Sequence, residues 1–373
     1  MTARAIQQQD RAETNPAFSS RKLKLGTFQT NLDSGCVMSD LDGRLDITWP
    51  TTLGLARLAE EMDFEALVPV ARWHGFGGAT NPQGRGFEAY TWAAGIAAST
   101  AKAGVFATSH ISLNHPIVAA KQSTVIDHIS GGRYALNIVT GWNQPEIDMF
   151  GSPMMGHTER YACAEEWLAI VKRLWTEDDA FDHEGKFYKI TRGYLQPKPI
   201  QRPHPAVMSA GASERGRHFA TKYADLVFTG RAHVQAYHRL AREEYGREVR
   251  VWTVANIVQG ETEQAARDFY RYYVHEKGDW EAAKNMIDTF TLDINARMIP
   301  TERLKAYQEA FIAGWGGFPL IGTKEQIVDG LQALSRAGLD GVLLCWPRFE
   351  QGMREFRDVT YPLVRQAGLR DLD

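Results

Sequence analysis

The stretch Arg133-Tyr134-Ala135-Leu136-Asn137-Ile138-Val139-Thr140-Gly141-Trp142-Asn143 decides the fold. Its apolar and β-branched residues favour an extended backbone, and Gly141 breaks the run. It is therefore predicted to be a short buried strand that stops at a turn. Asn137 interrupts the apolar run, and a buried amide without a partner is costly. The Asn137 side chain therefore either satisfies backbone groups or faces a ligand, and the stretch alone favours neither.

Seven other short apolar runs alternate with helical patterns along the chain, and the opening stretch is the fourth of eight. The other predicted strands cover residues 22–28, 66–70, 104–110, 206–211, 224–229, 249–258 and 341–346. Short strands that alternate with helices indicate a parallel sheet. We predict an α/β fold, a closed (β/α)8 TIM barrel. A doubly wound open sheet is the alternative, which eight units and two insertions suit less well.

The chain is predicted to contain one barrel domain, residues 21–373. It carries insertions after strand four, about 143–204, and after strand seven, about 278–322. Residues 1–20 are polar and lack the apolar core of a signal peptide, so they are read as a flexible arm.

The helix that follows strand three is expected to begin near Asn114, a residue that favours the N-cap, with Pro116 in the first turn. Val118, Val125 and Ile129 recur at helical spacing. This face is predicted to pack against the core.

The composition limits the function classes. The 373 residues include 44% hydrophobic residues and carry a formal net charge of −3, which indicates neither a nucleic-acid partner nor an anionic membrane surface. No apolar run reaches the roughly 18 residues that span a bilayer. The three cysteines are far apart in sequence, so no disulfide framework is expected, and a reducing, cytoplasmic location fits.

The strand ends indicate the kind of active site. In such barrels the active site lies at the C-terminal ends of the strands. These ends carry mostly apolar, aromatic and neutral polar residues, with no acidic cluster and no metal-like histidine spacing. We therefore expect no metal site and no serine-type acyl chemistry. A pocket of this composition suits a flat organic cofactor.

The turn Ala210-Gly211-Ala212-Ser213 follows strand five. Glycine lets the backbone approach an anion, and the next helix begins with free N–H groups and a serine hydroxyl. An ordinary strand–helix turn capped by Ser213 explains the tetrapeptide at least as well. Tyr161 could likewise contact a phosphate or simply pack.

Several segments, in this order, give the chain a family resemblance. They are residues 127–133 leading into 136–142, Glu184-Gly185-Lys186-Phe187-Tyr188, Gln196-Pro197-Lys198-Pro199, Gln201-Arg202-Pro203, and Ala210-Gly211-Ala212-Ser213 followed by Ala224-Asp225. From strand one to the last helix the chain resembles the bacterial luciferase-like flavin-dependent monooxygenases. The loop Gly75-Phe76-Gly77-Gly78 and Thr140-Gly141-Trp142 are similar to the subgroup of dimethyl sulfone monooxygenases and pyrimidine oxygenases.

The resemblance implies a two-component system. A separate NAD(P)H-dependent flavin reductase would supply reduced FMN, which reacts with O2 to give a flavin peroxide. A homodimer or homotetramer is expected.

The resemblance also implies roles for individual residues. The residues expected at the flavin ring are Val70, Thr108, Asn137 and Thr140. The residues expected at the phosphate are Tyr161, Gly211, Ala212 and Ser213. The residues expected on the substrate side are Phe28, Trp73, His74, Trp142, Phe228 and Trp346. The catalytic candidates are Asn137, Thr108, His110 and Arg297.

Two of these candidates have equally good structural explanations. His110 is a lone histidine at a strand end, and Arg297 could be an exposed residue of a loop. Residues 279–322 are expected to form a lid with glycine hinges at Gly314, Gly316 and Gly317.

The expected reaction is oxygenation of a small organosulfur substrate, a sulfone or sulfonate, with C–S bond cleavage. Oxygenation of a pyrimidine-type ring amide is the first alternative. A deazaflavin-dependent hydride transfer and a non-catalytic flavin-binding subunit are the others.

Overall fold

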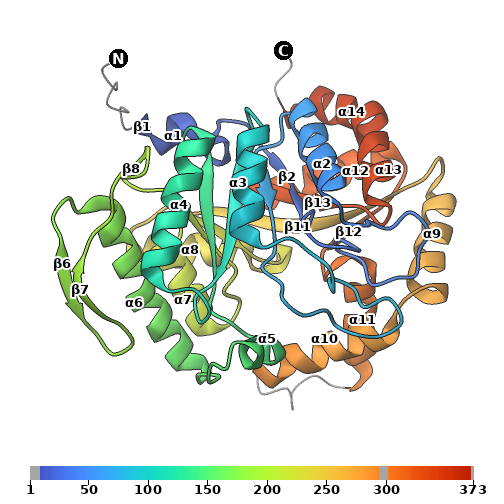
Figure 1. Ribbon diagram of the computed structural model, residues 1–373. Helices are drawn as coiled ribbons and strands as arrows, with labels where there is room; N and C mark the ends of the chain where they lie inside the picture. The colour runs from blue at the N-terminus through green and yellow to red at the C-terminus, as the bar shows by residue number, and fades with distance from the viewer. Residues whose placement is uncertain (1–8, 294–300, 371–373) are drawn as a thin grey trace.

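Eight parallel strands close into a barrel in the computed structural model, which describes residues 9–293 and 301–370 (Figure 1). The barrel strands are β2 (Lys24–Phe28), β3 (Ala66–Val68), β4 (Gly104–His110), β5 (Tyr134–Val139), β9 (Ala206–Ser209), β10 (Leu226–Phe228), β11 (Arg250–Gln259) and β13 (Gly341–Cys345). Each pairs in parallel with its neighbours, and β13 pairs with β2 to complete the ring. The predicted (β/α)8 barrel is confirmed, and the open sheet is excluded.

Helices surround the barrel. They are α2 (Trp49–Glu61), α3 (Ala89–Ser99), α4 (Pro116–Ser130), α6 (His157–Thr176), α7 (Glu214–Tyr223), α8 (Val234–Tyr245), α12 (Lys324–Arg336), α13 (Phe349–Glu355) and α14 (Tyr361–Gln366). The strands are buried on both faces, as parallel strands covered by helices must be. The hydrophobic core therefore fills the barrel and the layer between strands and helices.

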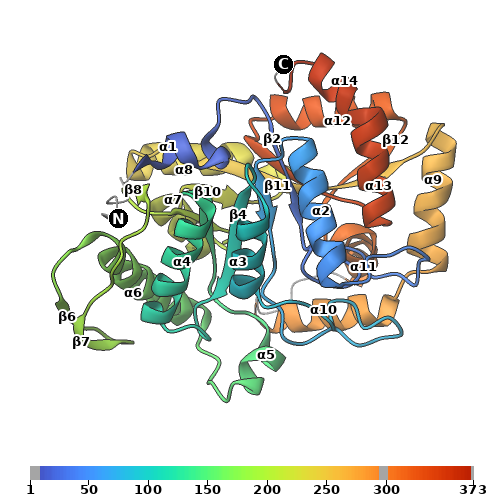
Figure 2. The same ribbon diagram turned by 45° about the horizontal axis from the view of Figure 1, so that its top comes forward.

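The segment after β5 contains α5 (Gln144–Met149), α6, the hairpin β6 (Phe181–Glu184) and β7 (Lys189–Gly193), and β8 (Gln201–Arg202). Helix α6 belongs to the outer ring, because its indole groups bind α4 and the loop that leads into it. Trp167 Nε1 donates to the Asn114 carbonyl at 2.7 Å, and Trp175 Nε1 donates to the Ala120 carbonyl at 3.1 Å. The material beyond a simple barrel is thus mainly α5 and the projecting hairpin (Figure 2).

The segment after β11 contains α9 (Glu263–Arg271), a π-helical turn η3 (Tyr272–Glu276), α10 (Trp280–Asp293), α11 (Thr301–Gly314) and β12 (Phe318–Gly322). Its base is tied to the glycine-rich loop, since Thr80 donates to Asp279 Oδ2 through both its N–H (2.7 Å) and its hydroxyl (2.8 Å). Gly314 lies against Asn256, whose Cγ would be 2.5 Å from an added Cβ. Close packing therefore explains Gly314 without a hinge.

The face of α4 that was predicted to be buried is exposed. Val118, Val125 and Ile129 are 51%, 48% and 42% exposed, whereas Ala119 and Ala120 are fully buried. Small residues let the helix approach the strands closely, so the larger apolar residues point outward. The cap also differs, because His115 accepts the Ile117 N–H, while Asn114 Nδ2 donates to the His110 carbonyl.

The prediction of a flexible arm is wrong for residues 9–20. Strand β1 (Gln9–Asp10) pairs with β8, and the short helices α1 (Arg11–Thr14) and η1 (Pro16–Phe18) follow. Arg11 binds Asp225 through two hydrogen bonds of 2.7 and 2.8 Å. Asn15 is 1% exposed and donates to the carbonyl of Tyr134, the first residue of β5. Polarity alone suggested mobility, but these polar groups have partners at the N-terminal end of the barrel.

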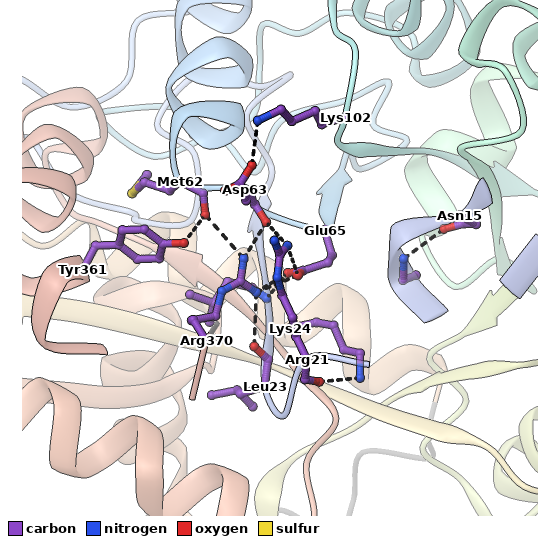
Figure 3. A network of polar contacts seen from close by, with 12 residues as sticks. Asn15, Arg21, Leu23, Lys24, Met62, Asp63, Glu65, Lys102, Tyr361 and Arg370 are labelled. Carbon is purple, nitrogen blue, oxygen red and sulfur yellow. Dashed lines mark hydrogen bonds and ion pairs between the residues drawn. The ribbon is translucent and has the colours of Figure 1, made fainter. Parts of the chain in front are cut away.

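A buried ion pair fastens the C-terminal segment to the same end of the barrel (Figure 3). The carboxylate of Glu65 is fully buried and lies 2.5 and 2.7 Å from Arg370 Nη1. It also accepts from Arg21 Nη1 and from the Leu25 N–H, each at 2.8 Å. The Tyr361 hydroxyl donates to the Met62 carbonyl beside this pair.

Cys36 and Cys345 are paired as a disulfide that joins the long loop after β2 to the end of β13. The sequence did not predict this pair, because its residues are 309 positions apart. In the part of the chain that the structure describes, no helix is long and apolar enough to cross a membrane.

Candidate active site

The C-terminal ends of the barrel strands face α5 and α10, on the side of the molecule opposite β1 and α14 (Figure 1). Strands β4 and β5 run side by side here, with Thr108 paired to Asn137 in register. The structure therefore brings together two residues that the family resemblance assigned to the flavin ring.

Thr108 and Asn137 form a buried polar chain. Asn137 Nδ2 donates to Thr108 Oγ1 at 3.1 Å, and Thr108 Oγ1 donates to the Pro69 carbonyl at 2.5 Å. Asn137 is 8% exposed, and its Oδ1 atom is buried without a hydrogen-bond partner. An unsatisfied buried acceptor is costly, so this oxygen is free to accept from a bound molecule. Val70 follows β3 and Thr140 follows β5, the two strands on either side of β4, and both residues are half-buried.

The predicted phosphate residues lie together around the start of α7. Ser213 caps α7 by accepting the Gly216 N–H at 3.1 Å, and the Tyr237 hydroxyl donates to the Gly211 carbonyl at 2.6 Å. An added Cβ on Gly211 would lie 2.5 Å from the Gly216 carbonyl oxygen, and one on Gly216 would lie 2.4 Å from the Tyr161 hydroxyl. The turn is therefore held in a shape that only glycine allows.

The turn from Ala210 to Ser213 and the start of α7 form a cradle, and this cradle fits a phosphate chemically. The N–H groups at the start of a helix favour an anion, and Ala212 is exposed, so the turn is accessible. Tyr161 is buried against Phe219, with ring centroids 5.8 Å apart, so its hydroxyl is fixed beside the turn.

Of the six predicted substrate residues, Trp142 packs edge-on against Phe290 of α10, with ring centroids 5.2 Å apart, and the other five divide into three groups. Phe28 and Phe228 meet across the barrel mouth with ring centroids 5.7 Å apart. Trp73 and His74 are exposed, and Trp73 packs edge-on against Phe150 at the outer edge of the mouth. Trp346 does not join either set, because its ring packs against Phe349 and Phe356 of the outer helices. Its position at a strand end did not reveal the direction of its side chain.

A buried charged group that the sequence reasoning missed lies at the same mouth. Arg72 Nη1 is 3.1 Å from Glu146 Oε1, and the two side chains are 2% and 0% exposed. The expectation of few charges at the strand ends is therefore incomplete. The sequence offered one signal of this pair, the single glutamate Glu146 in the short segment after strand four. Its partner Arg72 lies on another loop, so the pair could not be read from local sequence.

His110, the last residue of β4, lies beside this pair. Its Nδ1 atom is 3.5 Å from Glu146 Oε2. Burial lowers the pKa of His110 to about 4; the charge of Glu146 opposes this shift and that of Arg72 adds to it. At neutral pH the imidazole is therefore uncharged, and it can accept a proton or donate its single N–H. Arg297, the fourth catalytic candidate, lies outside the described residues.

The described ranges, 9–293 and 301–370, contain no group of three or more His, Cys, Asp or Glu residues that could hold a metal ion.

Comparison with known proteins identifies relatives of this chain. The model of the luciferase-like monooxygenase family matches residues 32–341. The chain is 31% identical over 360 residues to the FMNH2-dependent dimethylsulfone monooxygenase of Pseudomonas putida, covering 93% of this chain and 96% of that protein. It is 28% identical to a pyrimidine monooxygenase of Bradyrhizobium, covering 93% and 99%. The crystal structure of DmoA from Hyphomicrobium sulfonivorans superposes with a TM-score of 0.77 at 20% identity, covering 95% of this chain and 90% of that one.

Proposed function

The chain belongs to the luciferase-like monooxygenase family, and from this membership we propose that it oxygenates a small organosulfur compound, a sulfone or sulfonate, with C–S bond cleavage. It would use O2 and reduced FMN delivered by a separate NAD(P)H-dependent reductase, and a cytoplasmic location is part of the proposal. When bound, the flavin supplies the activation of O2. The protein supplies binding, orientation and exclusion of water.

The observation that carries the proposal is the unpartnered Oδ1 atom of Asn137, buried beside Thr108 at the barrel mouth. The ring of a reduced flavin carries N–H groups, and these supply the hydrogen-bond donor that the Asn137 oxygen lacks. The aromatic pair Phe28 and Phe228 at the mouth suits a small, weakly polar substrate. A relative that shares 31% of its residues is named for dimethyl sulfone.

A ring amide is the second candidate substrate, and one observation favours it. Glu146 Oε2 is buried and makes no hydrogen bond, although His110 Nδ1 lies 3.5 Å away. A sulfone offers only acceptor oxygens, whereas a pyrimidine ring offers N–H donors. The identity to a pyrimidine monooxygenase is nearly as high.

A substrate panel tests both candidates. The protein, a flavin reductase, FMN and NADH are supplied with dimethyl sulfone, methanesulfonate or uracil, and products are identified by mass spectrometry. Release of sulfinate or sulfite supports the organosulfur proposal, and an opened ring supports the second candidate. Oxygen consumption that yields only hydrogen peroxide with every compound contradicts both. Binding of a deazaflavin but not of FMN would indicate hydride transfer, and FMN binding without any turnover would indicate a binding subunit.

The glycine cradle gives a sharper test of the cofactor site. Gly211→Ala is expected to weaken FMN binding by about 10- to 100-fold, because the added methyl group collides with backbone at Gly216. Riboflavin, which lacks the phosphate, should bind the variant and the native protein equally well. Fluorescence titration measures both affinities.

Gly54→Ala, on the helix α2 with nothing within 4 Å of the added Cβ, is the matched control and should bind FMN normally. Equal weakening of riboflavin and FMN by Gly211→Ala would contradict a phosphate at this turn.

A homodimer or homotetramer is also proposed. The exposed stripe of Val118, Val125 and Ile129 on α4 is an apolar surface that a second copy of the chain would cover. Light scattering at micromolar concentration that gives the mass of one chain would overturn this proposal.

A further inference from the structure

One buried guanidinium connects the loops around the barrel mouth. Arg72 belongs to the loop after β3, and its Nε donates to Gln83 Oε1 at 3.0 Å. Removing a guanidinium from water is expensive, so a nearly buried arginine on a loop needs strong compensation.

Aromatic rings from three loops surround this cation. The Arg72 Cζ atom lies 4.9 Å from the ring centroid of Phe76, 5.3 Å from that of Trp142 and 5.9 Å from that of Trp315. Trp142 follows β5, and Trp315 lies between α11 and β12. A flat, delocalised cation stacks on aromatic faces, which an ammonium group does less well. Arg72 therefore contacts both additions to the simple barrel.

Glu146 fastens α5 to the loop that carries Arg72. Its Oε1 atom accepts from the backbone N–H groups of Trp73 at 2.7 Å and His74 at 3.3 Å, in addition to Arg72. Its other oxygen faces His110 at the end of β4. One ion pair thus joins the ends of β3, β4 and β5 with the segment after β11.

We propose that Arg72 and Glu146 are positioning residues that hold these loops closed over the reacting centre and keep water out. The inference rests on the proposed monooxygenase function, in which entry of water diverts reduced oxygen to hydrogen peroxide. Small displacements of positioned groups lower rates strongly. The loss of the pair should therefore change the fate of oxygen more than the binding of flavin.

The test compares Arg72→Lys with Arg85→Lys. Arg85 lies on the same loop, but it is exposed and forms a surface ion pair with Asp46. Arg72→Lys keeps the charge and loses the planar stacking surface. It is expected to bind FMN within about threefold of the native affinity while product per O2 falls at least fivefold and hydrogen peroxide rises correspondingly. Arg85→Lys should change neither quantity.

Hydrogen–deuterium exchange gives a readout that needs no substrate. In Arg72→Lys, exchange is expected to rise at residues 73–76, 142–150 and 311–317 while the barrel strands stay protected. Glu146→Gln should give the same rise in exchange at residues 73–76 and 142–150. Agreement between the two variants would show that the loss of the ion pair, and not a local distortion in one variant, causes the change. Unchanged exchange and unchanged coupling in Arg72→Lys overturn the proposal. Altered exchange in a protein that oxygenates nothing would instead refute the proposed function and keep the positioning role.

Discussion

Asn137→Ala is expected to lower the product formed per O2 by about 100-fold while hydrogen peroxide becomes the main oxygen product. Preorganised hydrogen-bonding groups at a reacting centre typically contribute about 10²- to 10³-fold to the rate. Asn137 holds Thr108 Oγ1 through Nδ2 and presents an unpartnered Oδ1 atom at the barrel mouth. The alanine removes both functions from the site. Mass spectrometry of the product and a peroxide assay measure the ratio.

Asn15→Ala is the matched control for this variant. Asn15 is also a buried asparagine, and its Nδ2 donates to the carbonyl of Tyr134 at the opposite end of the same strand. Its loss is expected to cost about 1 to 3 kcal/mol of stability and to leave the product ratio unchanged. If Asn137→Ala unfolds, or couples oxygen normally, then the asparagine serves packing alone.

Arg370→Ala is expected to give the largest loss of stability, about 3 to 5 kcal/mol, because it leaves the charge of Glu65 buried with one ionic partner fewer. The Glu65 carboxylate is fully buried, and Arg370 contributes two of its close contacts. Urea unfolding followed by tryptophan fluorescence measures the change in free energy.

Two further variants test the explanation. Arg354→Ala removes an exposed arginine that pairs with Glu350 one helical turn away, and it should cost about 0.5 kcal/mol or less. The double variant Glu65→Leu, Arg370→Met removes both charges and should be more stable than Arg370→Ala. A double variant as unstable as the single one would show that packing, and not the unpaired charge, dominates.

The sequence predicted the parts of the fold that depend on local pattern. Short β-branched runs between helical segments predicted eight strands. The family resemblance assigned Thr108 and Asn137 to the flavin ring, and β4 and β5 bring these two residues into register. The Gly211 turn required the family resemblance, because a serine cap and a phosphate cradle have the same local sequence.

The remaining features depend on tertiary contacts. Periodicity found the apolar stripe of Val118, Val125 and Ile129, but periodicity cannot tell which side of a helix faces the barrel when small residues such as Ala119 permit closer packing. The ion pair of Arg72 with Glu146 joins residues 74 positions apart. The local sequence around either residue does not identify its partner.

Closure of the barrel has a consequence for synthesis of the chain. Strand β2 pairs with β13, and roughly 300 residues separate them, which at about 5 to 20 residues per second means tens of seconds of translation. Until β13 exists, β2 presents an open sheet edge, a known template for unwanted pairing with other chains. The nascent protein must therefore rely on dilution, covering helices or chaperones during that interval. Slow expression at low temperature should raise the yield of folded protein by lowering the concentration of these unclosed chains.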